Sequence, residues 1–383
     1  MNAGWKTVKL GDVARYDKAQ GIHSGLPYVG LEHIESGTRK FIGSRSDMEV
    51  HSSTFLFNPN HVLYGRLRPY LRKVLVPDFA GHCSTEIFPI LPSDDLDRSY
   101  LSYWLITEST TGAIDRLCNG ARMPRANMEQ ALELEIPLPP LAEQKRIVAL
   151  LDDAFAGIDE AKEKAEASIQ SLGTLVVSEF QSLVDDKGFE RKLLPELASH
   201  TLGKMLDKKK NTGTPRPYLR NVNVRWFEFD LSDIHEMPIR DEEAARCQAR
   251  KGDVLMCEGG YPGRCAIWSS DEPVFFQKAL HRIRFNDKWM AQWFVNYMHS
   301  LDSSGKISEF FTGTGIQHLT GETLSKLKIP VPPKSEIEAY VKKISAIRDK
   351  TNELAASESA KVKALCELKA SLLTQAFAGE LTA

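Results

Sequence analysis

The stretch LELEIPLPPLAEQKRIV (Leu132 to Val148) returns later in the chain as LSKLKIPVPPKSEIEAYV (Leu324 to Val341), and this repeated pattern decides the fold. In both copies an alternating apolar run leads into Ile-Pro-x-Pro-Pro, and a Glu and a long helical pattern follow. Proline cannot donate to a β-ladder and disfavours helix in the residue before it, so the motif must be extended. Each motif therefore predicts the end of a globular part and the start of a helix.

Weaker repeats in the same order extend this symmetry over the whole chain. They match Pro27-Tyr28-Val29 with Pro217-Tyr218-Leu219, Asn58 to Val74 with Arg250 to Trp268, and Tyr100 to Trp104 with Trp289 to Trp293. Chance could supply one such pair, but several pairs in one order indicate an internal repeat. The 383 residues are therefore interpreted as two tandem copies, each a globular part followed by a helix.

The segments after the two Pro-Pro pairs, from Leu141 to about Leu183 and from Ser335 to Phe377, contain no proline and show heptad spacing. The predicted seam of the first comprises Ile147, Leu151, Ala154, Ile158, Ala161, Ala165, Ser168, Leu172 and Leu175. That of the second comprises Ile337, Tyr340, Ile344, Ile347, Thr351, Leu354, Glu358, Lys361, Leu365, Leu368 and Leu372. Alternating steps of four and three residues are typical of coiled coils. Glu358 and Lys361 interrupt the second seam.

The fold class predicted from these patterns is α+β, with two strand-rich domains and two long helices that pair as an antiparallel coiled coil. A helix of about 40 residues is about 60 Å long, and it would not be stable alone with its apolar stripe exposed. The alternative is that each helix packs only on its own domain. The predicted boundaries are residues 1–138 and 186–331 for the domains, and 139–185 and 332–383 for the helices. Short β-branched runs predict strands in the domains, with one helix per copy, at Tyr100 to Glu108 and at Trp289 to Leu301.

The composition of the chain and the absence of known catalytic motifs exclude several classes of protein. The net charge of −2 rules out a generally basic nucleic-acid binder, although a local basic face remains compatible with it. No apolar run approaches the roughly 20 residues of a membrane span, so we expect no membrane association. The six cysteines form no CxxC pair, which is typical of reduced thiols in the cytoplasm. No phosphate loop, dinucleotide fingerprint or nucleophile elbow occurs, and the cluster His82, Cys83 and Glu86 is more typical of an ordinary strand than of a metal site. We expect no catalytic residue, no metal and no cofactor in this chain.

Taken together, these features closely resemble the DNA-specificity (S) subunit of type I restriction–modification systems. The resemblance rests on the two Ile-Pro-x-Pro-Pro junctions, on Leu-Ala-Glu-Gln-Lys-Arg-Ile-Val after the first, and on Ser-Leu-Leu-Thr-Gln-Ala-Phe-Ala-Gly-Glu-Leu (Ser371 to Leu381). At the second junction Leu-Ala-Glu-Gln becomes Lys334-Ser335-Glu336-Ile337, so a partner need not use both junctions equally.

The resemblance implies a non-enzymatic, cytoplasmic subunit whose two domains each read half of a split, asymmetric double-stranded DNA target. It further implies docking of two methyltransferase subunits and of restriction subunits, which would supply the S-adenosylmethionine, ATP and Mg sites. The residues that would form the spacer and the docking surface are Glu143, Gln144, Ile147, Leu151, Ile158, Leu172, Ile337, Ile344, Leu354, Leu365, Leu372 and Phe377.

Polar loops at matching places in the two copies are the candidate DNA contacts. In the first copy they are Arg66, Arg68, Tyr70, Arg72 and Lys73, together with Asn119, Arg122 and Arg125. In the second copy they are Lys204, Lys208, Lys209, Lys210, Tyr261, Arg264, Thr314, Gln317 and His318. Arginine suits guanine edges and phosphates, glutamine suits adenine, and a lysine run suits phosphates. The plainer interpretation of each is a solvated loop or a structural turn.

Two other function classes remain open from the sequence. One is a coiled-coil interaction scaffold whose globular repeats bind protein or carbohydrate. The other is an enzyme with an unrecognised site, which the missing motifs disfavour. Loss of DNA binding on charge reversal in the arginine loops would separate the recognition subunit from the scaffold.

Overall fold

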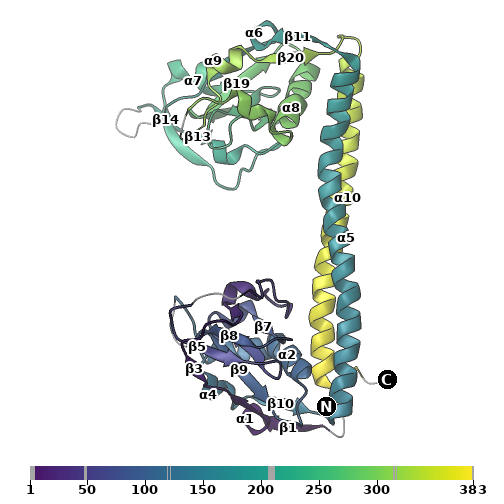
Figure 1. Ribbon diagram of the computed structural model, residues 1–383. Coiled ribbons are helices and arrows are strands. Elements are labelled where there is room, and N and C mark those ends of the chain that lie inside the picture. The colour runs from purple at the N-terminus through teal and green to yellow at the C-terminus, as the bar shows by residue number, and fades with distance from the viewer. Residues whose placement is uncertain are drawn as a thin grey trace. The chain divides into compact units, whose positions relative to one another are not determined.

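The structure, a computed structural model, describes residues 5–46, 50–118, 120, 122–205, 212–313, 315 and 317–381. The chain divides into two compact units. Unit 1 consists of Met1–Ala165 with Ala360–Ala383, and unit 2 of Glu166–Ser359. Each unit combines one strand-rich domain with part of the long helices α5 and α10 (Figure 1).

The domain of unit 1 is built from short strands and a few helices. Its strands are β1 (Lys6–Lys9), β2 (Ala14–Tyr16), β3 (Gln20–Gly21), β4 (Tyr28–Val29), β5 (Thr54–Phe57), β6 (Val62–Gly65), β7 (Val74–Leu75), β8 (Gly81–Ser84), β9 (Ile87–Pro92) and β10 (Glu135–Leu138). Its helices are α1 (Leu10–Val13), α2 (Arg98–Ile106), α3 (Glu108–Arg116) and α4 (Met128–Ala131), with 3-10 turns η1 (Leu31–His33) and η2 (Pro69–Leu71). The strands form two four-stranded sheets, β2-β9-β6-β7 and β3-β5-β8-β4, and the pair β1-β10.

The domain of unit 2 repeats this plan. Its strands are β11 (Glu190–Leu193), β12 (Ala198–Leu202), β13 (Thr214–Leu219), β14 (His235–Ile239), β15 (Gln248–Ala249), β16 (Val254–Cys257), β17 (Cys265–Ile267), β18 (Val274–Phe276), β19 (Leu280–Phe285) and β20 (Lys328–Val331). Its helices are α6 (Leu194–Leu197), α7 (Asp241–Cys247), α8 (Lys288–Ser303) and α9 (Gly321–Ser325), with η3 (Asn221–Asn223) and η4 (Lys306–Phe310).

The sheets of the two units correspond strand by strand, with one exception. The sheet β12-β19-β16-β17 and the pair β11-β20 match β2-β9-β6-β7 and β1-β10. In the remaining sheet, β14-β13-β18-β15, the parallel pair β13 and β18 matches β4 and β8. The fourth strand differs, because β3 pairs with β5 whereas β14 pairs with β13 at the opposite edge. The predicted α+β class and the tandem repeat are confirmed.

The prediction of one helix per domain was wrong for both units, and in unit 1 the helix expected at Tyr100 to Glu108 is itself divided in two. The expected helix is interrupted at Thr107, which adopts an extended conformation and caps α3 by accepting a hydrogen bond from the amide of Thr110. A threonine at such a position satisfies an otherwise unpaired amide, which favours a new helix start over continuation. The short helices α1, α4, α6, α7 and α9 were also not predicted.

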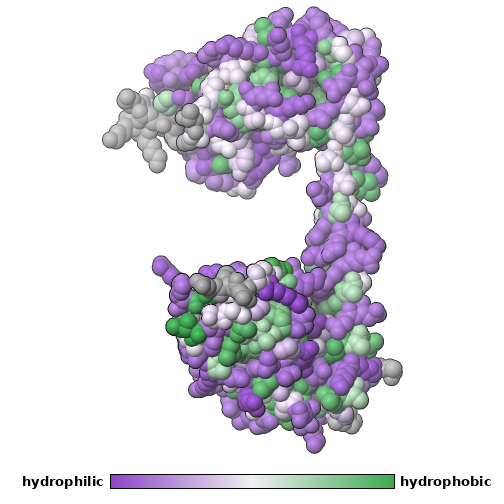
Figure 2. Space-filling model, in the orientation of Figure 1, coloured by the Kyte–Doolittle hydropathy of each residue, from purple (hydrophilic) through white to green (hydrophobic). Residues whose placement is uncertain are grey.

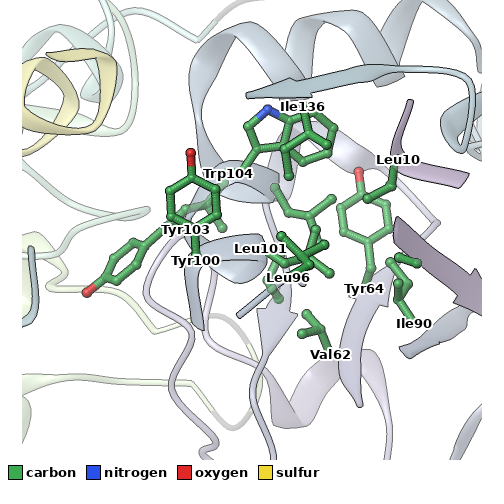
Figure 3. Close-up of a cluster of buried hydrophobic side chains, with 14 of the residues drawn as sticks. Leu10, Val62, Tyr64, Ile90, Leu96, Tyr100, Leu101, Tyr103, Trp104 and Ile136 are labelled. Atoms are coloured by element: carbon green, nitrogen blue, oxygen red, sulfur yellow. The ribbon is translucent and has the colours of Figure 1, made fainter. Parts of the chain in front are cut away.

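Each domain is anchored to the long helices by a buried apolar cluster. Figure 3 shows part of the cluster of unit 1, where Leu101 lies between Val62 and Tyr64 of β6 and Trp104 lies beside Ile136. Ile147 and Leu151 of α5 and Leu373 of α10 belong to the same cluster. In unit 2 the corresponding anchor is Trp293 of α8, which is fully buried. Because burial of one large apolar side chain stabilises a fold by about 1.5–3 kcal/mol, these clusters account for the docking of the helices on the domains.

The long helices α5 (Leu141–Lys187) and α10 (Ile337–Ala378) lie side by side and run antiparallel in both units (Figure 1). In unit 1, Arg146 donates to the carbonyl of Leu381 (2.8 Å), while Asp159, further along α5, pairs with Lys369, which is earlier in α10 (2.8 Å). In unit 2, Glu179 of α5 lies 3.4 Å from Lys343, close to the start of α10. The predicted antiparallel pairing is confirmed.

The predicted seam is correct near the junctions and, further along the helices, correct at Ala165 and Thr351 but wrong at several other positions. Ile147, Leu151 and Ile158 are buried, as are Ile337 and Ile344, whereas Leu175, Leu354 and Leu368 are between 43% and 48% exposed. A straight helix drifts about 20° per heptad relative to a 3.5-residue repeat, so a strict heptad pattern rotates out of the interface. Beyond Ala165 the buried positions of α5 are Val176, Val177, Phe180 and Val184, and of these none belongs to the predicted seam.

Candidate nucleic-acid interface

The two arginine loops predicted in the first copy lie against each other in unit 1. One is Gly65–Lys73, between β6 and β7, and the other precedes α4. The amide of Arg68 donates to the carbonyl of Pro124 (2.8 Å), and the amide of Ala126 donates to the carbonyl of Arg66 (2.9 Å). An isolated antiparallel bridge joins Leu67 to Arg125 between these bonds. Segments far apart in sequence thus form one polar surface.

The turn in the first loop depends on two residues in the left-handed region. Arg68 (φ 53°) and Arg72 (φ 50°) flank the 3-10 turn η2, and the carbonyl of Arg72 accepts a hydrogen bond from the amide of Gly37 (3.0 Å). Non-glycine residues adopt positive φ rarely and at an energetic cost, and such positions concentrate at functional sites. The reversal leaves Tyr70 at the apex, 51% exposed.

Of the six predicted arginines, Arg125 alone has an acidic partner within the described part of the chain, and three of the other five also lack any side-chain hydrogen bond or ring contact there. They are Arg68, Arg72 and Arg122, of which Arg68 and Arg122 are exposed. Unpaired guanidinium groups on one surface produce a local positive potential that suits phosphate or guanine contacts. This local face coexists with a net charge of −2, because acids elsewhere balance it.

The remaining cations of the first loop pair are bound by other groups of unit 1. Nε of Arg125 donates to the carboxylate of Glu86 (2.9 and 3.1 Å), and the guanidinium of Arg66 lies over the ring of Phe88 at 4.9 Å. Nζ of Lys73 donates to two carbonyls, of Leu31 (2.6 Å) and Ile34. Lys73 therefore stabilises η1 through these two hydrogen bonds.

The loops of unit 2 meet through equivalent hydrogen bonds. The amide of Leu319 donates to the carbonyl of Glu258 (2.8 Å), as Ala126 does to Arg66. The amide of Glu258 donates to the carbonyl of Ala279 (2.8 Å), as Arg66 does to Glu86. The side chains at these matched backbone positions differ in charge and size between the two units.

The two loops of unit 2 approach each other closely at a glycine. An isolated bridge joins Gly259 to His318, and a Cβ atom at Gly259 would lie 2.9 Å from Nδ1 of the imidazole. In unit 1 the matching bridge carries a leucine and an arginine, so the two loop pairs differ in the side chains at the bridge.

The predicted contact residues of unit 2 present a less basic surface. Tyr261 is 62% exposed, and the guanidinium of Arg264 lies over its ring at 3.9 Å while donating to the carbonyl of Asn221 (3.2 Å). Gln317 is exposed and His318 is half-buried. The predicted residues Asn119, Lys208, Lys209, Lys210 and Thr314 lie outside the described residues.

Lys204 was predicted as part of a phosphate-binding run, but the structure buries it. Its ammonium group pairs with the carboxylate of Glu243, and its backbone forms a bridge with Gln277. Hydrogen bonds from Arg240 and then from Lys204 lower the pKa of Glu243 to about 2, so this carboxylate stays ionised. The ion pair ties α7 to the sheet beside the loops.

One exposed cation beside the unit 2 loops was missed. Lys278 lies in the turn between β18 and β19, next to Ala279, whose carbonyl accepts the bond from Glu258. The matching turn of unit 1 holds Glu86. An alignment of the two copies through these turns would have identified the position of Lys278. The two turns share no residue pattern, so this alignment could not be made from the sequence.

The described residues contain no group of three or more His, Cys, Asp or Glu side chains that could hold a metal ion. Of the helices in this part of the chain, none combines the length and apolar character that a membrane span requires.

Comparison with known proteins gives one consistent result. A family model described as the type I restriction modification DNA specificity domain matches the chain twice, at residues 2–170 and 202–364. The chain is 29% identical over 181 residues to the type I restriction enzyme EcoDI specificity subunit of Escherichia coli, which covers 45% of this chain and 40% of that subunit. It is 26% identical over 315 residues to the EcoKI specificity subunit of E. coli K12, covering 76% and 67%. The chain thus spans less than half of the EcoDI subunit and about two thirds of the EcoKI subunit.

Two solved structures share the fold over the full chain. One comes from a study of complex assembly and conformational transition of the type I R-M system, with a TM-score of 0.84, 20% identity, and coverage of 100% of this chain and 99% of that one. The other is the HsdS subunit from Thermoanaerobacter tengcongensis, with a TM-score of 0.62, 19% identity, and coverage of 100% and 98%. At these identities the likeness concerns the fold.

Proposed function

We infer the function of this chain from its family: it belongs to the type I restriction–modification DNA specificity proteins. We propose that it recognises double-stranded DNA without catalysing a reaction. Each unit reads one part of a split, asymmetric target. Two non-identical domains in tandem are the single-chain equivalent of a dimer that reads two half-sites.

The observation that carries this proposal is the matched pair of loops in the two units. In both, the same backbone hydrogen bonds join two loops that are distant in sequence, as between Ala126 and Arg66 and between Leu319 and Glu258. The side chains that these loops present differ. A common frame with different polar groups is what two readers of different sequences require.

The chemistry of each loop pair favours a different kind of contact. Arg68, Arg72 and Arg122 suit guanine edges or phosphates in the half-site that unit 1 reads. Gln317 suits a bidentate contact with adenine, and Tyr261 with Arg264 forms a planar, cationic projection on unit 2. We keep Lys73 and Lys204 out of the contact set, because their ammonium groups are held inside the fold.

The long helices are proposed to bind the partner subunits. In unit 1 Leu150 of α5 and Leu368 of α10 are exposed, and in unit 2 Leu175 and Leu354 are exposed in the same way. Figure 2 shows hydrophobic surface along the helices among hydrophilic side chains. Exposed leucines from both helices in each unit suit two copies of one partner. The proposed partners are two methyltransferase subunits, with restriction subunits joining them, and these would supply the S-adenosylmethionine, ATP and Mg sites.

The decisive experiment is a methylome of cells that express this chain. The chain and its cognate methyltransferase are produced in a host without DNA methylation, and N6-methyladenine is mapped by sequencing. We expect methylation of a split motif with an unspecified gap, and exchange of residues 1–135 for those of another family member should change only one half of the motif. Absence of methylation, with a methyltransferase shown to be active alongside another specificity subunit, would refute the proposal and favour the interaction scaffold.

A binding assay tests the arginine loops directly. Arg68→Gln with Arg122→Gln should weaken binding to the target duplex and reduce the salt dependence of affinity, whose slope falls by about 0.9 for each lost phosphate contact. The control, Lys164→Gln with Lys363→Gln, removes the same charge from exposed helical sites. Equal losses in both variants would show that net charge, and not the loop surface, governs binding.

A further inference from the structure

The junctions between domain and long helix can be compared residue by residue, because both helices start in the same way. The amide of Gln144 donates to the carbonyl of Pro140, and that of Ile337 to the carbonyl of Pro333, each at 3.1 Å. Counted from these prolines, Asp152 of α5 is equivalent to Ser345 of α10.

The same count matches Phe155 with Arg348. These two positions lie one helical turn beyond Asp152 and Ser345, so they belong to the same face of each helix. An aromatic side chain in unit 1 is therefore replaced by a cation in unit 2.

The domain side of each junction has an equally clear register. The hydroxyl of Tyr100 and Nε1 of Trp293 both donate to the carbonyl of the first proline in their Ile-Pro-x-Pro-Pro motif, at 3.0 and 2.7 Å. This register corrects the match expected from the sequence, which placed Tyr100 at Trp289, four residues earlier. Three residues later on these helices stand Tyr103 and Asn296, which are therefore equivalent. Tyr100 and Tyr103 lie together at one side of the buried cluster of unit 1 (Figure 3).

A loop residue with positive φ completes each junction. In unit 1 the loop after η1 closes with an isolated bridge at Phe41, and Arg39, two residues earlier, has φ 64°. In unit 2 the loop after η3 closes at Phe229, and Phe227, two residues earlier, has φ 68°. Arg39 and Phe227 are thus equivalent.

In unit 1 the junction binds a carboxylate whose side chain is about half exposed. Asp152 accepts hydrogen bonds from Nη2 of Arg39 (2.8 Å) and from the hydroxyl of Tyr103 (2.5 Å). The guanidinium of Arg39 lies over the ring of Tyr103 at 3.4 Å and donates from Nη1 to the hydroxyl of Ser102. Phe155 packs edge-on against Tyr103. The cation, the acid and the aromatic groups form a closed set.

In unit 2 the cation and the aromatic group have exchanged places. Arg348, on the helix, lies over the ring of Phe227, on the loop, at 3.8 Å, and its Nη1 donates to the side-chain oxygen of Asn296 (3.1 Å). The position of Asp152 is occupied by Ser345. Within the described residues no carboxylate lies in ion-pair distance of Arg348. Burial lowers the pKa of this arginine, against the opposing effect of the neighbouring Asp349.

A cavity of about 310 Å³ lies where the acid is missing. All five positions equivalent to the closed set of unit 1 line it, namely Phe227, Val295, Asn296, Ser345 and Arg348. The rest of the wall combines apolar side chains with Gln292 and Ser269. A cavity of this size with one cation and a few polar groups among apolar ones is typical of a site for a small ligand.

We propose that this cavity of unit 2 binds a carboxylate, which occupies the place that Asp152 holds in unit 1. The guanidinium of Arg348 binds the anion, and the hydroxyl of Ser345 supplies a further donor. The ligand is an organic acid with a small apolar body or an acidic side chain presented by a bound protein. The inference does not depend on the proposed function, because it rests on the internal repeat and on an uncompensated cation.

The test uses the full chain with acetate and benzoate as probes, followed by ligand-observed NMR and calorimetry. We expect saturable binding of benzoate at one site, weakened about tenfold or more in Arg348→Gln, since hydrogen bonds to charged groups carry most of such affinity. The control Lys350→Gln removes a positive charge from an exposed position two residues after Arg348, and this variant should bind benzoate as the wild type does. No saturable binding, or equal binding by Arg348→Gln, would overturn the proposal.

A second variant keeps the proposal falsifiable if Arg348→Gln does not fold. Ser345→Asp supplies an internal carboxylate one turn from Arg348, so it should raise Tm and abolish benzoate binding. A variant that binds benzoate as the wild type does, without a rise in Tm, would contradict the proposed position of the anion.

The source of the carboxylate is resolved by adding the methyltransferase subunit, an arm that rests on the proposed function. If benzoate and Arg348→Gln both weaken that complex, the anion is an acidic side chain of the partner. If benzoate binds without affecting the complex, the ligand is a free organic acid.

Discussion

Acidification should destabilise unit 2 through His281, a buried histidine of β19 that anchors the loop carrying Gln317 and His318. Nε2 of His281 donates to the carbonyl of Leu319 (3.2 Å), while Nδ1 is buried without a partner. Burial first, and then the proximity of His200, whose ring centre lies 6.1 Å away, lower the pKa of His281 from 6.5 to about 4. The ring is therefore neutral in the folded protein at any pH above about 4.

The sign and size of the effect follow from this shift. As the pH falls below 6.5 the unfolded chain takes up a proton that the folded chain does not, so the free energy of unfolding decreases until the pH reaches about 4. The predicted loss is about 2 kcal/mol at pH 5 and about 3 kcal/mol once the pH is below the folded value. The pKa of His200 is also lowered by burial, which adds to the loss in the same direction.

Urea unfolding near neutral pH and at about pH 5 measures this loss. Tryptophan fluorescence reports mainly on unit 2, which contains four of the six tryptophans, Trp226, Trp268, Trp289 and Trp293. His281→Gln should remove most of the pH dependence. His235→Gln, at an exposed position of β14, should retain the pH dependence. The reasoning would be refuted if, between the two pH values, the wild type lost no more unfolding free energy than His281→Gln does.

Three further predictions concern unit 1. Gly81→Ala should lower the free energy of unfolding by about 1–3 kcal/mol, because the new Cβ atom would lie 2.4 Å from the carbonyl of Pro27. Gly157→Ala, in an open helical position, should raise the free energy of unfolding by up to about 1 kcal/mol. Thermal unfolding of both variants checks this contrast, and equal effects would contradict it. Arg39→Gln and Asp152→Asn should show a coupling of about 1 kcal/mol in a double-mutant cycle, and additive losses would mean that the junction is not a unit. Glu86→Gln should release the guanidinium that it holds and steepen the salt dependence of DNA affinity by about 0.9; an unchanged slope would exclude that arginine from the DNA surface.

The start of the long helices was predictable because proline acts locally. A residue without an amide donor imposes its conformation whatever surrounds it, so the beginning of α5 at Leu141 follows from Pro139 and Pro140 alone. The antiparallel pairing and the repeat followed from patterns that extend over the whole chain. These features depend on spacing, and spacing can be read from the sequence.

The features that failed depend on contacts between distant residues. Lys73 and Lys204 have the composition of phosphate-binding loops, but the carbonyls of η1 and the carboxylate of Glu243 bind them, and nothing near them in sequence indicates these partners. The exposure of Leu175 and Leu354 results from the gradual rotation of a straight helix, which a heptad count ignores. The exchange of cation and aromatic group between the two junctions leaves no periodic signal.

The main-chain origin of the bonds that join the loops has an evolutionary consequence. Amide and carbonyl groups are present whatever the side chain, so Arg66 or Glu258 can be replaced without removing the bond from Ala126 or Leu319. Selection on the target sequence and selection on foldability therefore act on separate atoms of the same residues. The frame that holds the two loops together is therefore compatible with many different side chains at these positions.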